Sequence, residues 1–281
     1  MCIRDSIYSG SSRTDNESNI YSDEVIRDLR KLKEDEDVKA VVLRVNSPGG
    51  SAFGSEQIWY AVTELKKEKP VIVSMGDYAA SGGYYISCNA DSIVADPTTL
   101  TGSIGIFGMF PNVKGLTDKI GLSFDVVKTN TYSDFGMMGR ALNDGEKALM
   151  QNMVNEGYEL FVKRCAEGRG MTTNEIKKIA EGRVWTGAKA KELGLVDELG
   201  GLDKALEMAI GKAGLDAYTV MSYPGKKSFF ETLMDTNPGG YIQSRMLKGK
   251  VGELYNQFDW LNNFENYDKI QARVPFELNI N

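Results

Sequence analysis

Two short apolar runs, each followed at once by glycines and small residues, constrain this chain more than any other feature. Residues 39–46 (KAVVLRVN) and residues 70–75 (PVIVSM) are too short for core helices, so we predict buried strands. Residues 55–67, between them, have helical periodicity, and Ser92–Ala95 is predicted as a third strand. Strands that alternate with helices at this spacing predict an α/β fold with a mainly parallel sheet and right-handed crossovers.

Further elements are predicted from periodicity and from capping residues. They are a surface helix over residues 22–32, a strand over 123–128, a polar loop over 130–143 followed by a long helix, and two helices capped by Thr172 and Thr186. A loop as long as residues 130–143 is typically functional, although a mobile surface loop is the plain alternative.

The second predicted strand leads into residues 76–85 (GDYAASGGYY), where Ser81 is surrounded by small residues. A serine at a strand-to-helix turn presents its Oγ beside the unpaired N–H groups of the helix. The first strand ends in residues 47–51 (SPGGS), whose glycines expose backbone N–H groups. In a parallel sheet both loops lie at the carboxyl edge, so we expect a hydroxyl nucleophile to meet oxyanion donors there. An ordinary turn between strand and helix is the alternative.

The amino-acid composition excludes several kinds of active site. The chain has no histidine, which excludes a Ser-His-Asp triad and histidine metal sites. A nucleophilic Ser81 would need another base, and lysine is the usual one. Cys2, Cys88 and Cys165 have no metal-binding spacing, so we predict no metal or cofactor and expect Cys88 and Cys165 to be buried free thiols. A net charge of −6 argues against nucleic acid as a partner.

Several motifs in a fixed order resemble one known family. They are residues 42–50 (VLRVNSPGG), 79–85 (AASGGYY), 100–108 (LTGSIGIFG), 180–187 (AEGRVWTG) and 194–200 (GLVDELG). Together they are similar to signal peptide peptidase A, a family of serine–lysine peptidases with the ClpP/crotonase fold. The resemblance extends from about residue 22 to about residue 223.

The resemblance implies a role for each matched residue. Ser81 would be the nucleophile, and the N–H groups of Gly49 and Gly82 would hold the oxyanion, with Gly50 as an alternative to Gly49. Ser103 matches a position at which a second hydroxyl orients the base lysine. The resemblance further implies hydrophobic peptide substrates such as released signal peptides, a homo-oligomer, and membrane association on the outer side of the inner membrane in a bacterial cell envelope.

The base lysine is absent from its matched position. Short members of the family carry it where this chain has Ser133. Long members are tandem repeats, in which the amino-terminal repeat donates the lysine to the serine of the carboxyl-terminal repeat. We therefore expect this chain to correspond to the carboxyl-terminal half of a long form, inactive alone because a missing upstream repeat supplies the lysine. Lys128 is the nearest substitute within the chain.

These expectations divide the chain into three parts. Residues 1–21 form a polar or artefactual amino terminus, residues 22–223 the peptidase domain, and residues 224–281 a helical appendage for subunit or membrane-surface contact. No stretch of the appendage reaches the eighteen or so apolar residues of a membrane span. Two other functions stay open: a crotonase-type acyl-CoA enzyme, whose paired N–H groups would stabilise an enolate, and a non-catalytic scaffold of the same fold.

Overall fold

The computed structural model describes residues 1–11, 19–223 and 269–273. Its larger sheet has seven strands in the order β1-β4-β6-β7-β11, with β8 beside β6 and β10 beside β8. Every pairing is parallel except that of β8 with β10. This confirms the predicted α/β class and the mainly parallel sheet. The strands are β1 (Cys2–Arg4), β4 (Val41–Ser47), β6 (Val71–Ala80), β7 (Ser92–Ala95), β8 (Leu100–Gly102), β10 (Val184–Thr186) and β11 (Glu198–Leu199).

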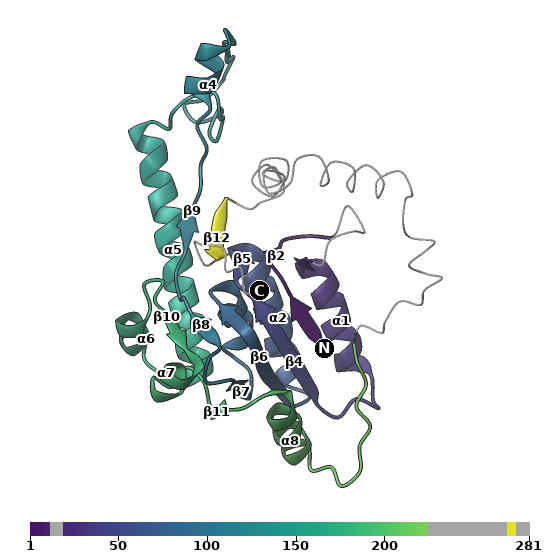
Figure 1. Cartoon of the computed structure of the whole chain (residues 1–281). Coiled ribbons are helices and arrows are strands. Elements are labelled where there is room, and N and C mark those ends of the chain that lie inside the picture. The colour runs from purple at the N-terminus through teal and green to yellow at the C-terminus, as the bar shows by residue number, and fades with distance from the viewer. Residues whose placement is uncertain (12–18, 224–268, 274–281) are drawn as a thin grey trace, which may run out of the picture.

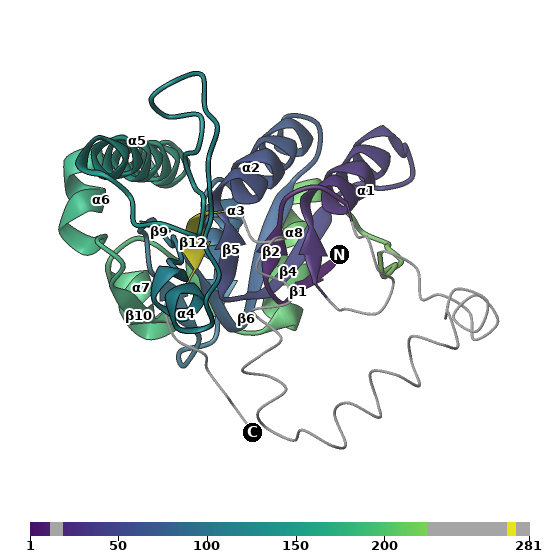
Figure 2. The ribbon, with the colours of Figure 1, turned by 90° about the horizontal axis from the view of Figure 1, so that it is seen from above.

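Helices cover both faces of this sheet. Helices α1, α2 and α5 lie in a row along one face, and α8 packs on the other (Figures 1 and 2). Val73 of β6 joins the main core, whereas the neighbouring Ile72 packs with Ala205 and Ala209 of α8. Burial on both faces explains why this strand is a continuous apolar run. The helices are α1 (Ser22–Glu34), α2 (Ala52–Lys66), α3 (Gly82–Ser87), α5 (Asp144–Arg169) and α8 (Leu202–Ala213).

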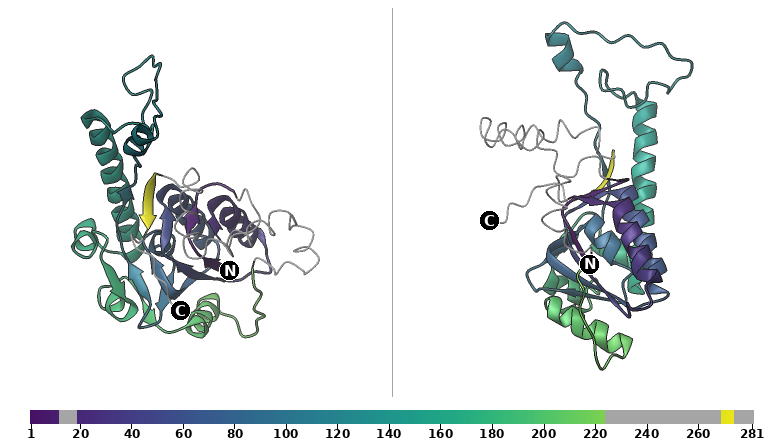
Figure 3. Two further views of the ribbon diagram at one scale, coloured as in Figure 1. Left: turned by 45° about the horizontal axis from the view of Figure 1, so that its top comes forward. Right: turned by 90° about the vertical axis from the view of Figure 1, so that its right-hand side faces the viewer.

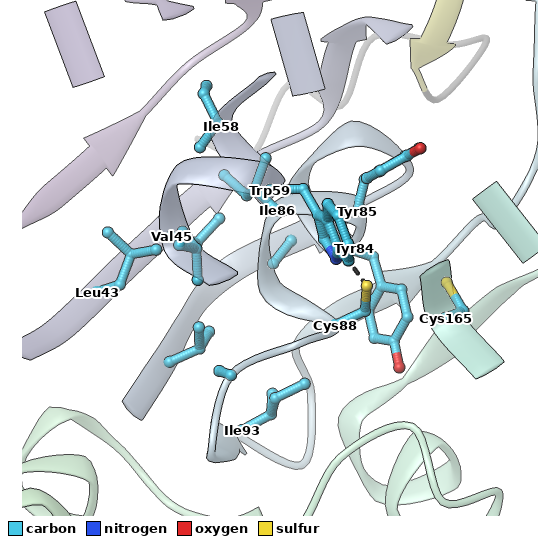
Figure 4. Close-up of a cluster of buried hydrophobic side chains, with 14 of the residues drawn as sticks. Leu43, Val45, Ile58, Trp59, Tyr84, Tyr85, Ile86, Cys88, Ile93 and Cys165 are labelled. Carbon is cyan, nitrogen blue, oxygen red and sulfur yellow. Dashed lines mark hydrogen bonds between the residues drawn. The ribbon is translucent and has the colours of Figure 1, made fainter. Parts of the chain in front are cut away.

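The main core lies directly beneath the segment that follows Ser81. Tyr84, Tyr85 and Ile86 of α3 meet side chains from β4, α2, β7 and α5 (Figure 4). Cys88 and Cys165 are both free and buried, as expected. Because α3 is buried on all sides, the backbone that enters it has little freedom to move.

A second, five-stranded sheet has the order β3-β2-β5-β12-β9. It joins four stretches that are distant in the sequence, because β5 pairs with β2 on one side and with β12 on the other, and β12 pairs antiparallel with both β5 and β9. Figure 1 shows β12 in yellow beside β5. The strands are β2 (Ile7–Tyr8), β3 (Ile20–Tyr21), β5 (Gly49–Ser51), β9 (Phe107–Gly108) and β12 (Ile270–Arg273).

Of the predicted polar or artefactual amino terminus, residues 1–21, the structure describes residues 1–11 and 19–21, which contain strands β1, β2 and β3. Ile3 and Ile7 are 3% and 1% exposed, β1 pairs with β4, and the amino group of Met1 donates to the Val42 carbonyl. These residues belong to the same two sheets as the rest of the domain. Most of the predicted helical appendage, residues 224–268 and 274–281, lies outside the described residues, and the part within them is strand β12.

Between β9 and α5 the chain forms an arm, residues 109–143, that stands away from both sheets (Figures 1 and 3). It contains the short helix α4 (Lys114–Lys119). The strand predicted over residues 123–128 is wrong: this part of the arm is irregular. Its apolar residues pair with no strand among the described residues, and Val127 is 99% exposed. The polar loop over 130–143 and the caps at Thr172 and Thr186, which open α6 (Thr173–Ile179) and α7 (Gly187–Glu192), are confirmed.

A network of charges ties the arm to the start of α5. The Arg140 guanidinium donates to both carboxylate oxygens of Glu146 and to Asp134, which also accepts from Lys128. Arg140, and for Asp134 also Lys128, lowers the pKa of each carboxyl group to about 2. The side chain of Glu146 is fully buried, so its charge depends on Arg140.

We expect Arg140→Gln to destabilise the arm in a pH-dependent way. A carboxyl group whose pKa is lower in the folded state than in the unfolded chain stabilises the fold at pH values above its unfolded pKa of about 4. That stabilisation is lost as the pH falls through the folded-state pKa of about 2. The melting temperatures of wild type and variant should therefore differ most above about pH 5 and converge toward about pH 2. Arg183→Gln, which removes an exposed ion pair with Glu181, is the matched control. A difference that does not depend on pH would contradict this account.

Candidate active site

Ser81 lies at the junction of β6 and α3, as predicted. The strand runs to Ala80, beyond the predicted end at residue 75, and Ser81 takes the position before the first helical residue. Its backbone has φ +54° and ψ −114°, a conformation that L-residues rarely adopt. The Ser81 N–H donates to the Gly102 carbonyl (2.8 Å), and the Ser81 carbonyl accepts from Tyr85 (2.8 Å). Strand and helix thus hold the strained residue from both sides.

The hydroxyl of Ser81 is weakly engaged. The residue is 1% exposed, and its Oγ lies 3.5 Å from the Gly105 carbonyl oxygen, a long hydrogen bond. Among the described residues, no lysine or arginine forms a hydrogen bond with this oxygen. The hydroxyl is therefore positioned by the backbone rather than by a base.

Ser103 follows β8 as Ser81 follows β6. The pairing of β6 with β8 places Ala80 beside Gly102. Ser81 and Ser103 are the residues that directly follow this pair, one after each strand. Ser103 also has a positive φ, +49°, and its N–H donates to the Arg183 carbonyl (2.7 Å). Within the described part of the chain its hydroxyl forms no hydrogen bond. The structure brings together the two serines that the sequence singled out.

Gly49 of β5 packs against Gly82 of α3. It has φ +102°, and a methyl group built on it would lie 2.7 Å from the Gly82 nitrogen. A side chain at this position would separate the two backbones, so only glycine permits the contact. Gly50 is oriented differently: it pairs with Ile7 of β2, and an added methyl would lie 2.1 Å from the Ile7 carbonyl oxygen. Of the two glycines, Gly49 is the one beside Gly82.

Lys128 and Ser133 both lie on the arm. The Lys128 amine is 3.0 Å from an Asp134 carboxylate oxygen and 3.4 Å from the Thr131 carbonyl oxygen, so both of these contacts belong to the arm's own charge network. Its side chain is 41% exposed. A catalytic base must lie within hydrogen-bond reach of the hydroxyl that it deprotonates, and the Lys128 amine forms no hydrogen bond with Ser81 Oγ.

Sequence reasoning missed one strand at this site. β12 lies along β5 with Ala272 opposite Gly50 and Arg273 opposite Gly49. The Ala272 carbonyl oxygen lies 2.1 Å from a methyl group built on Gly49 and 2.9 Å from one built on Gly82. The short run IQAR carries only a weak alternation of apolar and polar residues, which is too little to find a strand by pattern alone.

The described residues were also compared with the requirements of a metal site and of a membrane-spanning helix. No group of three or more cysteine, aspartate or glutamate residues in the described part is arranged to hold a metal ion. No helix among those residues is both long and apolar enough to cross a membrane.

A serine on a strained strand-to-helix turn, with glycine backbones beside it, has the geometry of a nucleophile elbow. Residues 63–216 match the model of peptidase family S49, and the chain belongs to that family. This finding supports the resemblance on which the assigned roles rest.

Curated relatives agree with the family. The chain is 45% identical over 197 residues to Protease 4 of Haemophilus influenzae (69% of this chain, 31% of the relative) and 42% identical over 222 residues to Protease 4 of Salmonella typhi (79% and 36%). It is 38% identical over 199 residues to the chloroplastic serine protease SPPA of Arabidopsis thaliana (70% and 29%). The chain thus spans about a third of the length of these relatives.

A solved structure of a ClpP1 mutant from Listeria monocytogenes resembles the chain with a TM-score of 0.48 and 16% identity, covering 73% of this chain and 92% of that one.

Proposed function

We propose that this chain supplies the nucleophile and the oxyanion donors of a serine–lysine endopeptidase. The observation that carries the proposal is the strained Ser81 held beside the contact of Gly49 with Gly82. Family S49 membership supports peptide bonds as the target. The resemblance supports hydrophobic peptides, such as released signal peptides, as the substrate class.

In the proposed reaction, Ser81 Oγ attacks the carbonyl carbon of the peptide bond while its proton passes to a lysine amine. The N–H groups of Gly82 and Gly49 stabilise the negative oxygen of the tetrahedral intermediate. The Gly49 N–H now donates to Ser47 Oγ over 3.2 Å, a long bond that a charged oxygen would readily replace. The amine product leaves with the proton from the lysine. The lysine then takes a proton from water as the water attacks the acyl-enzyme, and it returns that proton to Ser81 Oγ as the acid product leaves.

We infer that the base lysine comes from outside the described residues, in the long form from an amino-terminal repeat. The commitment of Lys128 to Asp134 supports this, as does the unengaged hydroxyl of Ser103, which is suited to orient an incoming ammonium group. Lys128 stays the alternative within the chain. Homo-oligomer formation and contact with the membrane surface of a bacterial cell envelope are further proposals, supported by exposed apolar residues on the arm such as Leu116, Ile120 and Val127.

We expect the 281-residue chain to show no measurable peptide turnover by itself. Without a base the Ser81 hydroxyl stays protonated, and general-base assistance is worth about 10²–10⁴ in rate. Labelling by a fluorophosphonate should be slow, and adding the amino-terminal repeat of a long relative should accelerate both labelling and turnover. Robust cleavage by the chain alone, lost in Lys128→Ala but kept in the exposed control Lys114→Ala, would make Lys128 the base.

A further inference from the structure

The two proposed oxyanion donors belong to different elements, and each of these elements is joined to a helix. Gly49 lies in β5, which leads directly into α2, and Gly82 is the first residue of α3. The two helices pack against each other. An oxyanion is held well only when both donors keep a fixed spacing, so a contact that ties α2 to α3 also sets the geometry of the donors.

A hydrogen bond between Tyr85 of α3 and Glu56 of α2 joins the two helices close to the donors. The Tyr85 hydroxyl donates to a Glu56 carboxylate oxygen (2.7 Å), and the Tyr85 N–H donates to the Ser81 carbonyl (2.8 Å). One residue therefore bonds to the nucleophile through its backbone and to α2 through its side chain. A second link, from Asn89 to Thr63 (2.8 Å), lies beyond the carboxyl end of α3, away from the donors.

Helix α5 holds both partners of this hydrogen bond in place. The Arg164 guanidinium donates to Glu56 through Nη2 (2.5 Å) and Nε (3.2 Å), and it lies 3.9 Å from the centroid of the Trp59 ring. The Tyr85 ring stacks on Phe161, with the ring centroids 4.2 Å apart. Burial and the hydrogen bond to Glu56 raise the pKa of Tyr85, so its hydroxyl keeps the proton that it donates. The carboxylate and the ring are thus both fixed in orientation.

We propose that Tyr85 and Glu56 are positioning residues, which fix the spacing of the two oxyanion donors by tying α3 to α2. The proposal rests on the proposed peptidase function. Tyr85 acts through the helical turn that begins at Ser81, and Glu56 acts through the helix that follows β5. Because the donors meet their full charge only in the transition state, loss of this bond should lower kcat and leave KM nearly unchanged.

Tyr85→Phe removes the hydroxyl and keeps the ring, and Tyr84→Phe is its matched control. Tyr84 is the neighbouring buried tyrosine, and its hydroxyl donates to the Leu195 carbonyl (2.9 Å), outside α2 and α5. Each variant loses one hydrogen bond, so the two melting temperatures should fall by similar amounts. In an active form that includes the source of the base lysine, Tyr85→Phe should lower kcat for a fluorogenic alanine–leucine peptide amide by about tenfold or more, with KM within about twofold of wild type. Tyr84→Phe should keep both constants within about twofold.

Substitutions of Glu56 test the other end of the bond. Glu56→Ala should lower kcat as Tyr85→Phe does, whereas Glu56→Gln keeps a carbonyl oxygen that can accept from Tyr85 and should retain most of the turnover. The double variant should lose no more than Glu56→Ala alone, because both residues act through one bond.

Equal kcat values in Tyr85→Phe and Tyr84→Phe, additive losses in the double variant, or a loss in Glu56→Gln as large as in Glu56→Ala would overturn the proposal and leave Ser81 as the nucleophile. A folded Ser81→Ala protein with full turnover would instead refute the proposed function, and hydrogen exchange of the isolated chain would then decide. The amide of residue 85, which donates to the Ser81 carbonyl, should exchange about threefold faster or more in Tyr85→Phe than in Tyr84→Phe. Equal exchange would show that the bond to Glu56 does not hold this turn.

Discussion

Replacing Ser81 by alanine should abolish peptide cleavage in an active form of the protein, one that includes the source of the base lysine. The hydroxyl forms the acyl-enzyme, so its loss should reduce turnover by about 10³-fold or more. Alanine keeps the Cβ and removes one oxygen with a single long hydrogen bond, so the free energy of unfolding should change by about 1 kcal/mol or less. Turnover and thermal melting are measured on the same preparation.

Ser87→Ala is the matched control for this experiment. Ser87 lies on the same helix, is fully buried and donates to the Gly83 carbonyl, so its removal tests packing without touching the nucleophile. The control should retain turnover and fluorophosphonate labelling. A folded Ser81→Ala protein that still cleaves peptide would exclude Ser81 as the nucleophile.

Gly49→Ala should remove most of the activity through the oxyanion donors. The new methyl group would lie 2.7 Å from the Gly82 nitrogen, at a φ of +102° that alanine rarely adopts. Separating the two backbones should lower kcat by about 10²–10³-fold, the usual effect of losing one donor. The strained backbone should also cost about 1–3 kcal/mol of stability.

Gly214→Ala separates these two effects. Gly214 also has a positive φ, +63°, but nothing lies within 4 Å of a methyl group there. The control should therefore lose stability and keep its turnover. Equal losses of turnover in both variants would mean that Gly49 acts through stability alone.

Local patterns were sufficient to predict much of the fold. The apolar runs that became β4, β6 and β7 were too short for other elements, and the caps at Thr172 and Thr186 depend on residues only three positions apart. The turn at Ser81 was predictable for the same reason, because glycine and alanine on both sides of one serine leave few conformations. Its pairing with Ser103 followed only from the family resemblance.

Features that depend on distant partners could not be predicted. Residues 123–128 have strand propensity but pair with no strand in the part of the chain that the structure describes, whereas β12 has a weak pattern and two neighbours. The amino-terminal strands were missed because their apolar residues, Ile3 and Ile7, are isolated in a polar sequence. In each case pairing across the sheet decided the structure, and a single sequence does not show which strands will meet.

The composition of β5 has a consequence for altering selectivity. Its three residues are Gly49, Gly50 and Ser51, so this strand offers backbone groups and almost no side chains. Under the proposed function, a peptide held along it would be bound by backbone groups, and few side chains there can be exchanged without disturbing the oxyanion donors. Attempts to redirect the proposed cleavage should therefore target Phe107 of β9, on the other side of β12, and the positions of α2 that face β12.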